Sequence, residues 1–249
     1  MNVAIQREGI TLRGRMDRPE GEKCPTVIMF HGFAGNIGEA DGDLFDILSK
    51  ALLKVGIATV RFDFSGHGKS DGSFVEMDVL REIEDGIAIL RYVRSLEFVT
   101  DISILGHSQG GVVGGMLAGL YEDVIHRLVL LAPAATLKDD ALNGFCMGTT
   151  YDTEHIPDVV SLNDGMLSVG GQYYRIAKHL PIYEVTKSFK KPALVIHGMQ
   201  DILVNPIAAK RYHEELHNCH LGLYPNLDHG IFGADQDKAM NQIITFLRG

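Results

Sequence analysis

Cysteine is scarce in this chain, and the few cysteines lie far apart. The 249 residues include three, Cys24, Cys146 and Cys219, and no two of them form a C-x-x-C pair. An odd number of widely separated cysteines argues against a disulfide framework and against a cysteine-rich zinc site. We therefore expect a reducing compartment and a cytoplasmic location.

Positive charge is also in short supply. The chain has 23 lysine and arginine residues against 32 aspartate and glutamate residues, a formal net charge of −9. An acidic protein gains nothing from releasing the counterions of DNA or RNA, and anionic membranes repel it. We expect neither nucleic acid nor a membrane as a partner. Because no basic segment followed by an apolar one stands at the N-terminus, we also expect no signal peptide.

Only one stretch is long and uncharged enough to suggest a membrane span. Residues 102–121 contain no Asp, Glu, Lys or Arg, and about 20 such residues would cross a bilayer. The stretch also contains a His-Ser-Gln triplet and six glycines. We therefore interpret it as a buried strand, a tight turn and a buried helix.

Buried-strand patterns alternate with helical patterns along most of the chain. This alternation predicts one α/β domain over residues 1–249, with a mostly parallel sheet covered by helices on both faces. Between residues 133 and 190 no buried-strand run appears, which indicates an insertion with some structure of its own. The apolar strand runs are residues 26–30, 57–62, 102–105, 128–131, 193–196 and 221–224, and helical spacing recurs in 44–55, 79–90 and 240–247.

The motif Gly106-His107-Ser108-Gln109-Gly110 lies within the glycine-rich stretch. A G-x-S-x-G sequence is modest evidence alone, but here a strand pattern precedes it and a helix pattern follows it. That context is the one in which the motif presents a nucleophilic serine. The outer glycines fit a strained turn in which Cβ atoms would collide with neighbours. Because a serine hydroxyl is a poor nucleophile, Ser108 needs a base.

The base and its supporting acid are expected later in the chain, in the order serine, acid, histidine. His229 stands between the last strand pattern and the last helix, and Asp201 follows the strand pattern of residues 193–196. Both positions lie at the carboxyl ends of strands, where sites form in such sheets. Asp201 would fix the tautomer of His229. The rival acids are Asp139, Asp140 and Asp228.

Two backbone N–H groups should stabilise the oxyanion. One belongs to Gln109, and the candidate for the other is Phe33, in the loop after the first buried strand. The glycine-rich residues 61–72 contain neither common phosphate-binding pattern, and His213 and His217, spaced as on one helix face, have no accompanying carboxylate ligands. We expect neither a metal ion nor an organic cofactor.

Five motifs follow one another along the chain: H-G-F, R-F-D-F-S-G-H-G-K-S-D-G, G-H-S-Q-G, H-G-M-Q-D and D-H-G. With these motifs in this order, the chain resembles the α/β-hydrolase superfamily over nearly its whole length. Residues 131–142, 170–177 and 180–185 are similar to parts of the cap of the bacterial cinnamoyl (feruloyl) esterases. The resemblance implies a single α/β-hydrolase domain with a cap insertion at about residues 134–188.

The same resemblance implies the substrate class, hydroxycinnamoyl esters such as feruloyl, cinnamoyl and chlorogenate esters. In that family an Asp and a Tyr of the cap reach the phenolic hydroxyl, and by position these are Asp140 and Tyr173. Some members carry a Gln near the ester oxygens where this chain has Met147, whose thioether cannot donate a hydrogen bond.

The triad alone leaves other functions open. A monoacylglycerol, another acyl ester or a peptide could serve the same serine, and a non-catalytic ligand-binding protein on this fold is a further alternative. A small-molecule ester is the expected partner, and the sequence leaves the formation of a homodimer open.

Overall fold

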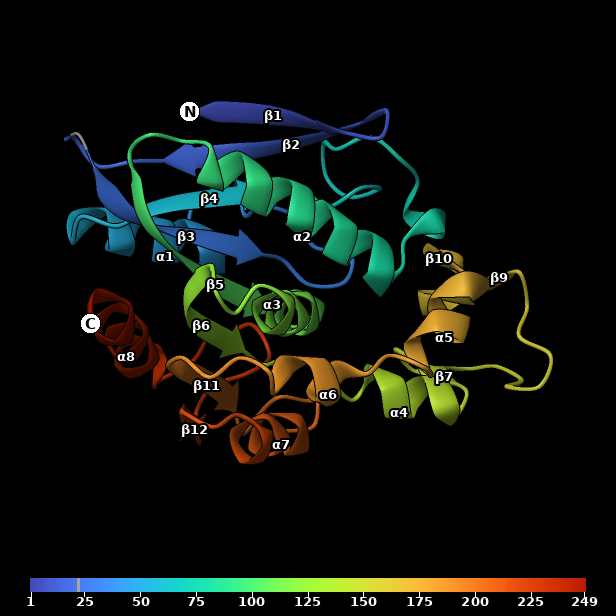
Figure 1. Ribbon diagram of the computed structural model, residues 1–249. Coiled ribbons are helices and arrows are strands. Elements are labelled where there is room, and N and C mark those ends of the chain that lie inside the picture. Colours follow the sequence, from blue (N-terminus) through green and yellow to red (C-terminus); the bar gives the residue numbers. More distant parts are fainter. Residues whose placement is uncertain (22) are drawn as a thin grey trace.

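One eight-stranded sheet forms the centre of the molecule (Figure 1). The computed structural model describes residues 1–21 and 23–249. The strand order of the sheet is β1-β2-β4-β3-β5-β6-β11-β12. The neighbours from β4 to β12 run parallel, and β1 and β2 are antiparallel strands at one edge. The bounds are β1 (Asn2–Arg7), β2 (Ile10–Asp17), β3 (Cys24–Phe30), β4 (Ala58–Phe62), β5 (Val99–His107), β6 (Ile125–Leu131), β11 (Ala193–Gly198) and β12 (Cys219–Tyr224).

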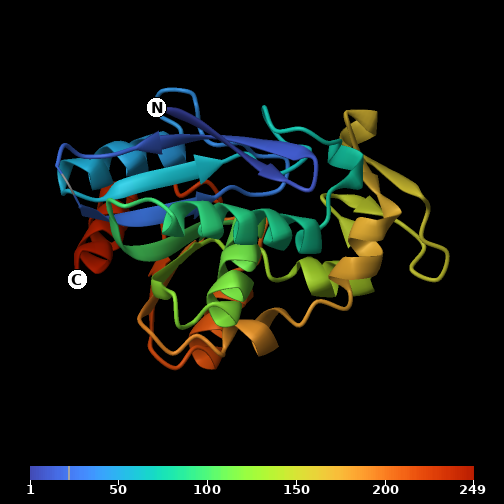
Figure 2. The ribbon, with the colours of Figure 1, turned by 45° about the horizontal axis from the view of Figure 1, so that its top comes forward.

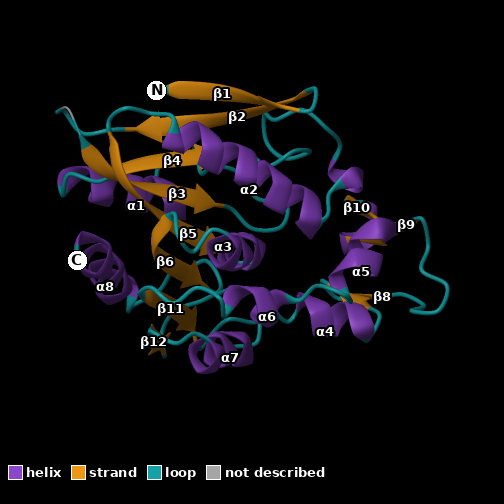
Figure 3. Ribbon diagram, in the orientation of Figure 1, coloured by secondary structure: helices purple, strands orange, loops and turns teal. Residues whose placement is uncertain are grey.

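Helices cover both faces of this sheet (Figure 3). Helices α1 and α8 lie on one face, and α2, α3 and α7 lie on the other (Figure 1). In α1, α2, α7 and α8 the buried residues recur at helical spacing, so each of these helices turns one stripe toward the sheet, whereas α3 is buried on all sides over most of its length. The α/β class and the layered arrangement predicted from the sequence are thus confirmed. The bounds are α1 (Leu44–Lys54), α2 (Val79–Arg94), α3 (Gln109–Leu120), α7 (Ile207–Glu215) and α8 (Gln236–Arg248).

The segment between β6 and β11 extends beyond the carboxyl ends of the parallel strands (Figure 2). It pairs β7 with β8 and β9 with β10 in two small antiparallel ladders, four short strands that no sequence pattern predicted. These strands have two to four residues each, too few to leave a strand pattern. The bounds are α4 (Leu137–Leu142), β7 (Phe145–Cys146), β8 (Thr149–Thr150), β9 (Val159–Leu162), η2 (Asn163–Gly165), β10 (Leu167–Gly170), α5 (Gly171–Ala177) and α6 (Ile182–Thr186), with η1 (Phe74–Glu76) before α2.

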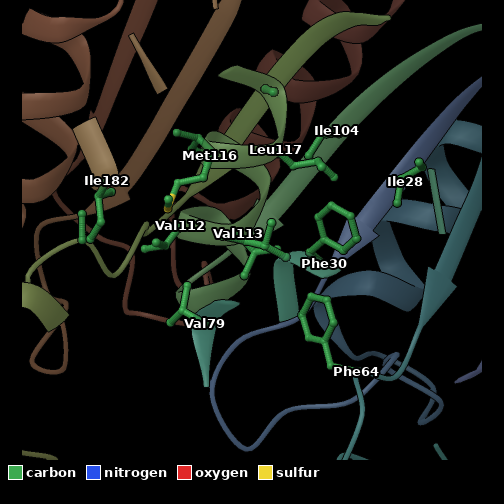
Figure 4. Close-up of a cluster of buried hydrophobic side chains, with 14 of the residues drawn as sticks. Ile28, Phe30, Phe64, Val79, Ile104, Val112, Val113, Met116, Leu117 and Ile182 are labelled. Atoms are coloured by element: carbon green, nitrogen blue, oxygen red, sulfur yellow. The ribbon is translucent and has the colours of Figure 1, made fainter. Parts of the chain in front are cut away.

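The sheet separates two apolar clusters, and α3 packs at the centre of the larger one. Figure 4 shows Val112, Val113 and Met116 of α3 in this cluster with Phe30 of β3 and Ile104 of β5. The helix approaches the sheet closely because its inner face carries small residues. A Cβ atom on Gly114, for example, would lie 2.8 Å from Ile104 Cγ2. The motif serine therefore stands between two rigid elements.

Each of the six predicted strand runs lies in or overlaps one of β3, β4, β5, β6, β11 and β12. No strand pattern predicted β1 and β2. In β1 half-buried residues alternate with exposed ones, as in an antiparallel edge strand with one wet face, so no continuous apolar run marks it. Residues 102–121 do form a strand, a turn and a helix. Within residues 1–21 and 23–249, no helix has both the length and the apolar character needed to cross a membrane.

Candidate active site

Ser108 occupies the sharp turn between β5 and α3. Its backbone has φ 56° and ψ −123°. Residues other than glycine seldom adopt this conformation, and where they do, the backbone is strained, often at a functional site. The turn is tight because the flanking glycines meet backbone directly. A Cβ atom on Gly106 would collide with Gly110 O, and one on Gly110 would collide with Phe30 O. The side chain is thereby held at the carboxyl edge of the sheet.

His229, in the loop between β12 and α8, joins the serine to an acid. Its Nε2 lies 2.9 Å from Ser108 Oγ, and its Nδ1 lies 2.7 Å from Asp201 Oδ2. The carboxylate can only accept, so Nδ1 carries a proton and Nε2 of the neutral ring is free to accept the serine proton. The structure therefore brings Ser108, His229 and Asp201 together in the order that base catalysis requires.

Asp201, in the loop after β11, is held by several donors. Its Oδ1 accepts the backbone N–H groups of Leu203 and Val204, and its Oδ2 accepts both His229 Nδ1 and His197 Nε2. Burial alone would raise the pKa of this carboxyl, but the hydrogen bonds from His197, His229 and Val204 hold it well below its usual range. Asp201 is therefore ionised at neutral pH, as the partner of an imidazolium must be.

The rival acids are placed elsewhere. Asp228 Oδ1 accepts the N–H of Phe232 in its own loop. Asp139 is exposed on α4. Asp140, one residue on, lines the cavity at Ser108, yet the acid bonded to His229 is Asp201.

Two further histidines support the triad, and the sequence analysis assigned neither of them a role. His197, fully buried at the end of β11, donates from Nε2 to Asp201 Oδ2 at 2.9 Å and to Val204 O at 3.1 Å. His107 Nε2 donates to the backbone carbonyl of His229 at 2.8 Å. His107 directly precedes Ser108 in G-H-S-Q-G, and His197 shares the motif H-G-M-Q-D with Asp201. Membership in these motifs was the only signal available.

The loop after β3 carries the expected oxyanion donor, Phe33. Phe64 N–H donates to His31 Nε2 at 3.1 Å, so the proton of the neutral His31 ring sits on Nδ1 and donates to Gly32 O at 2.9 Å. Gly35 N–H donates to the same carbonyl. In a planar trans peptide the Phe33 N–H points opposite to Gly32 O. Among residues 1–21 and 23–249, neither Phe33 N–H nor Gln109 N–H has a hydrogen-bond acceptor, and both residues line the cavity at Ser108.

The neutral state of His31 gives a prediction about stability. Burial lowers the pKa of His31 to about 4, whereas an unfolded histidine has a pKa of about 6.5. The unfolded state thus binds the extra proton as pH falls from about 6.5 to 4, and His31 makes the fold less stable over that window. In His31→Gln, the free energy of unfolding should fall with acidification less steeply than in the wild type, by up to about 1.4 kcal/mol per pH unit.

Urea unfolding of both proteins at several pH values between 4.5 and 8 measures this difference in slope. Between pH 7.5 and 8 the two slopes should agree, because His31 is neutral there in both the folded and the unfolded chain. Equal slopes below pH 6 would show that His31 is not the buried neutral group described.

A cavity of about 420 Å³ opens at Ser108. Asp140, Tyr173 and Met147 all line it together with Ser108 and His229, so the structure gathers every sequence-predicted site residue in or beside one cavity, Asp201 lying behind His229. Burial raises the pKa of Asp140, against a lowering hydrogen bond from Thr136. Met147 is partly exposed in the β7–β8 turn with a φ of 46°.

The hydroxyl of Tyr173 has a partner within the protein. It donates to Gln109 Oε1 at 2.8 Å, and its ring packs against that of Phe33, with centroids 5.7 Å apart. Tyr173 therefore contacts both residues expected to bind the oxyanion. The resemblance to the feruloyl esterases implied a contact between this side chain and substrate, and no sequence pattern indicated the bond to Gln109.

The described residues contain no group of three or more His, Cys, Asp or Glu side chains arranged to hold a metal ion. His213 and His217 do not share a helix, because α7 ends at Glu215. The expectation that their spacing places both on one helix face is wrong.

Comparison with known proteins places the chain. The sequence profile of the family described as serine aminopeptidase S33 matches residues 21–151. The structure resembles that of Est1E from Butyrivibrio proteoclasticus, solved with ferulic acid bound, at a TM-score of 0.93 and 33% identity, over 99% of this chain and 98% of that one. The chain belongs to the family described as serine aminopeptidase S33, within the α/β-hydrolase superfamily. The resemblance to the bacterial feruloyl esterases inferred from the sequence is confirmed.

Other relatives of this α/β-hydrolase are more distant. The monoacylglycerol lipase of Mycolicibacterium smegmatis is 23% identical over 91% of this chain and 89% of its own length. Mouse alpha/beta hydrolase domain-containing protein 10 shares the fold, with a TM-score of 0.80 at 20% identity over all of this chain and 98% of that one. The protein is accordingly an esterase- or lipase-type serine hydrolase.

Proposed function

We propose that this protein is a serine carboxylesterase that hydrolyses hydroxycinnamoyl esters of the feruloyl, cinnamoyl or chlorogenate type. One observation carries the proposal: the hydrogen-bonded chain Ser108–His229–Asp201 opens into a cavity that Asp140 and Tyr173 also line. The likeness to Est1E, whose structure holds ferulic acid, supports the acyl group. Residues 134–188 act in this proposal as the cap that closes over it.

The mechanism follows from the positions of the protons. His229 Nε2 takes the proton of Ser108 Oγ as the oxygen attacks the ester carbonyl carbon, and the carbonyl oxygen becomes an oxyanion. The Phe33 and Gln109 N–H groups bind that oxyanion. His229 then gives its proton to the leaving alcohol, which departs and leaves an acyl group on Ser108. Water, activated by His229 in the same way, releases the acid.

The lining of the cavity supports an aromatic acyl group with a hydroxyl on its ring as the substrate. Apolar side chains line the cavity together with polar ones, among them Asp140 and Tyr173. Because Tyr173 donates its hydroxyl proton to Gln109, its oxygen faces other groups as an acceptor. An acceptor recognises a free phenolic hydroxyl, which donates, and gains nothing from a methyl ether at the same position. A site that binds a hydroxyl in this way should discriminate against substrates that lack it.

Asp140→Ala and Tyr173→Phe should therefore change the choice of acyl group. Loss of one hydrogen bond to substrate should lower kcat/KM for methyl ferulate by about 0.5–1.5 kcal/mol, or about 2- to 12-fold. For methyl cinnamate, which has no ring hydroxyl, Asp140→Ala should have little effect. Tyr173→Phe also breaks the bond to Gln109, so it should lower both rates, and that for ferulate more.

Tyr151→Phe is the matched control for this experiment. Its hydroxyl donates to Ala141 O within the same segment, and the cavity lining does not include it. This variant should leave the ratio of the ferulate and cinnamate rates unchanged. Equal losses on both esters in Asp140→Ala would mean that the carboxyl holds the segment together and does not contact substrate.

The monoacylglycerol lipase of M. smegmatis, which aligns along most of the chain, makes a glyceride ester the second candidate substrate. A hydrolysis panel of methyl ferulate, chlorogenate, short p-nitrophenyl esters and a monoacylglycerol separates the two. Highest kcat/KM on the monoacylglycerol would replace the proposed substrate class. A fluorophosphonate probe tests the triad independently of the substrate, because a non-catalytic binding protein would not be labelled on Ser108.

A further inference from the structure

A buried carboxyl on α2 contacts the oxyanion residue Gln109 from behind. Glu82 is 1% exposed, and its Oε2 accepts the Gln109 Nε2 amide at 2.9 Å. On the other side of the same amide, Gln109 Oε1 accepts the Tyr173 hydroxyl at 2.8 Å. The Gln109 side chain is thus held at both ends, one by α2 and one by α5.

The second oxygen of Glu82 faces a buried histidine. Glu82 Oε1 and His67 Nε2 lie 3.9 Å apart, and neither atom has a hydrogen-bond partner among the described residues. His67 Nδ1 lies 3.2 Å from Ser65 O. Because a carbonyl only accepts, the ring proton of a neutral His67 sits on Nδ1, and its Nε2 presents a lone pair to Glu82.

A neutral Glu82 carries its proton on Oε1, facing the His67 Nε2 lone pair across 3.9 Å, a separation longer than a hydrogen bond. Burial raises the pKa of Glu82 well above its usual range, with Asp85 and Asp78 acting in the same direction against the Gln109 hydrogen bond. Burial also lowers the pKa of His67 to about 4. A neutral acid beside a neutral imidazole is the arrangement with no isolated buried charge.

We propose that Glu82 is a positioning residue for the oxyanion hole. Its neutral carboxyl, protonated on Oε1 toward His67, holds the Gln109 side chain through Oε2 and thereby fixes the Gln109 backbone N–H beside Ser108. The His67 ring also lies 5.0 Å from that of His31, whose Nδ1 contacts the Gly32 carbonyl next to Phe33. Glu82 and His67 therefore lie next to the side chains that contact the two oxyanion-binding segments, Gln109 and His31. The inference rests on the proposed esterase activity, since it assigns Glu82 a part in the same reaction.

Two substitutions distinguish positioning from a general need for a buried acid. In Glu82→Gln, the amide oxygen accepts from Gln109 and the amide NH₂ faces His67, so the side chain reproduces the shape and polarity of the neutral acid. This variant should keep kcat on p-nitrophenyl butyrate within about twofold. Glu82→Met fills a similar volume but leaves Gln109 Nε2 with only the weak thioether acceptor of Met77, at 3.5 Å. Since removal of an oxyanion donor costs about 10²–10³ in kcat, a displaced donor should lower kcat at least about tenfold and leave KM little changed.

A boronic acid, which forms a tetrahedral adduct with Ser108, measures the oxyanion hole directly. Its affinity should fall in Glu82→Met in parallel with kcat and stay near the wild-type value in Glu82→Gln. In the infrared difference spectrum between wild type and Glu82→Gln, the C=O stretch of a protonated carboxyl should disappear. A carboxylate signal in that spectrum would contradict a protonated Glu82. So would a loss of activity in Glu82→Gln equal to that in Glu82→Met.

The matched control is Asp85→Asn, one turn along the same helix. Asp85 is fully buried, pairs with Arg7 and accepts Ser65 N–H, so this variant should lose stability while keeping kcat. Should Glu82→Met not fold, Gln109→Met breaks the same contact from the other side and should show the same fall in kcat at constant KM. Wild-type kcat in the folded variant that breaks the contact would overturn the proposal. Failure of the wild type itself to hydrolyse any ester would instead refute the proposed function.

Discussion

Replacing Ser108 by alanine is expected to lower kcat on any ester by about 10⁶-fold, the size of the loss when the nucleophile is removed from another serine hydrolase. The expectation rests on the strained turn that presents Ser108 and on its 2.9 Å contact with His229 Nε2. The residual rate, about 10³–10⁴ above that in water, would come from binding and from the oxyanion donors alone. Initial rates on p-nitrophenyl butyrate measure the loss.

Ser188→Ala is the control for this variant, because Ser188 is exposed after α6 and away from the cavity. It should match the wild type in both rate and labelling by a fluorophosphonate. The Ser108→Ala protein should unfold at nearly the wild-type temperature yet take up no label. Retention of even a tenth of the wild-type turnover would end the assignment of Ser108 as nucleophile.

Asp201→Asn should lower kcat by about 10⁴, the loss found where a triad aspartate is changed to its amide. Here the geometry says which way the new amide turns. The N–H groups of Leu203 and Val204 both donate to the Oδ1 position, so they hold the amide oxygen there. The NH₂ group then occupies the Oδ2 position and donates to His229 Nδ1. The ring proton therefore moves to Nε2, and Nε2 can no longer accept the proton of Ser108.

Asp140→Asn is the comparison for this second experiment, measured on a non-phenolic ester such as p-nitrophenyl butyrate. Its turnover should stay within about tenfold of the wild type, because Asp140 lines the cavity and the acid bonded to His229 is Asp201. A large loss in Asp140→Asn with a small one in Asp201→Asn would place the working acid after β6 and contradict the assignment.

The triad could be predicted because each of its members follows a local pattern. Ser108 stands in a glycine-flanked motif between a strand and a helix, and Asp201 and His229 follow recognisable strands. Parallel strands bring their carboxyl ends to one edge of the sheet, so such residues converge whatever the loops between them do. The strands β1 and β2 and the short strands of the segment between β6 and β11 could not be predicted. Residues of β1 alternate between half-buried and exposed, those of β2 alternate between apolar and polar, and the short strands have only two to four residues each, so none of them produces an apolar run.

The hydrogen bonds that hold the site residues in place could not be predicted from local patterns. His197 donates to Asp201 although it stands in the apolar environment of β11, and a buried histidine in a strand is usually a core residue with a satisfied hydrogen bond. The hydroxyl of Tyr173 was expected at the substrate, and it donates to Gln109, 64 positions earlier in the chain. The choice of partner depended on how α5 packs against α2 and α3.

The sequence by itself thus determined the fold class and the family, and it predicted the three residues that the structure joins in one hydrogen-bonded chain. Strand runs, turn glycines and the nucleophile motif each occupy a few consecutive positions. Only the tertiary structure decided how buried polar groups pair: His197 with Asp201, and Glu82 and Tyr173 with Gln109. A buried polar group must find a partner within about 3 Å. Which partner lies that close is set by the packing of elements far apart in the chain, and no local pattern records it.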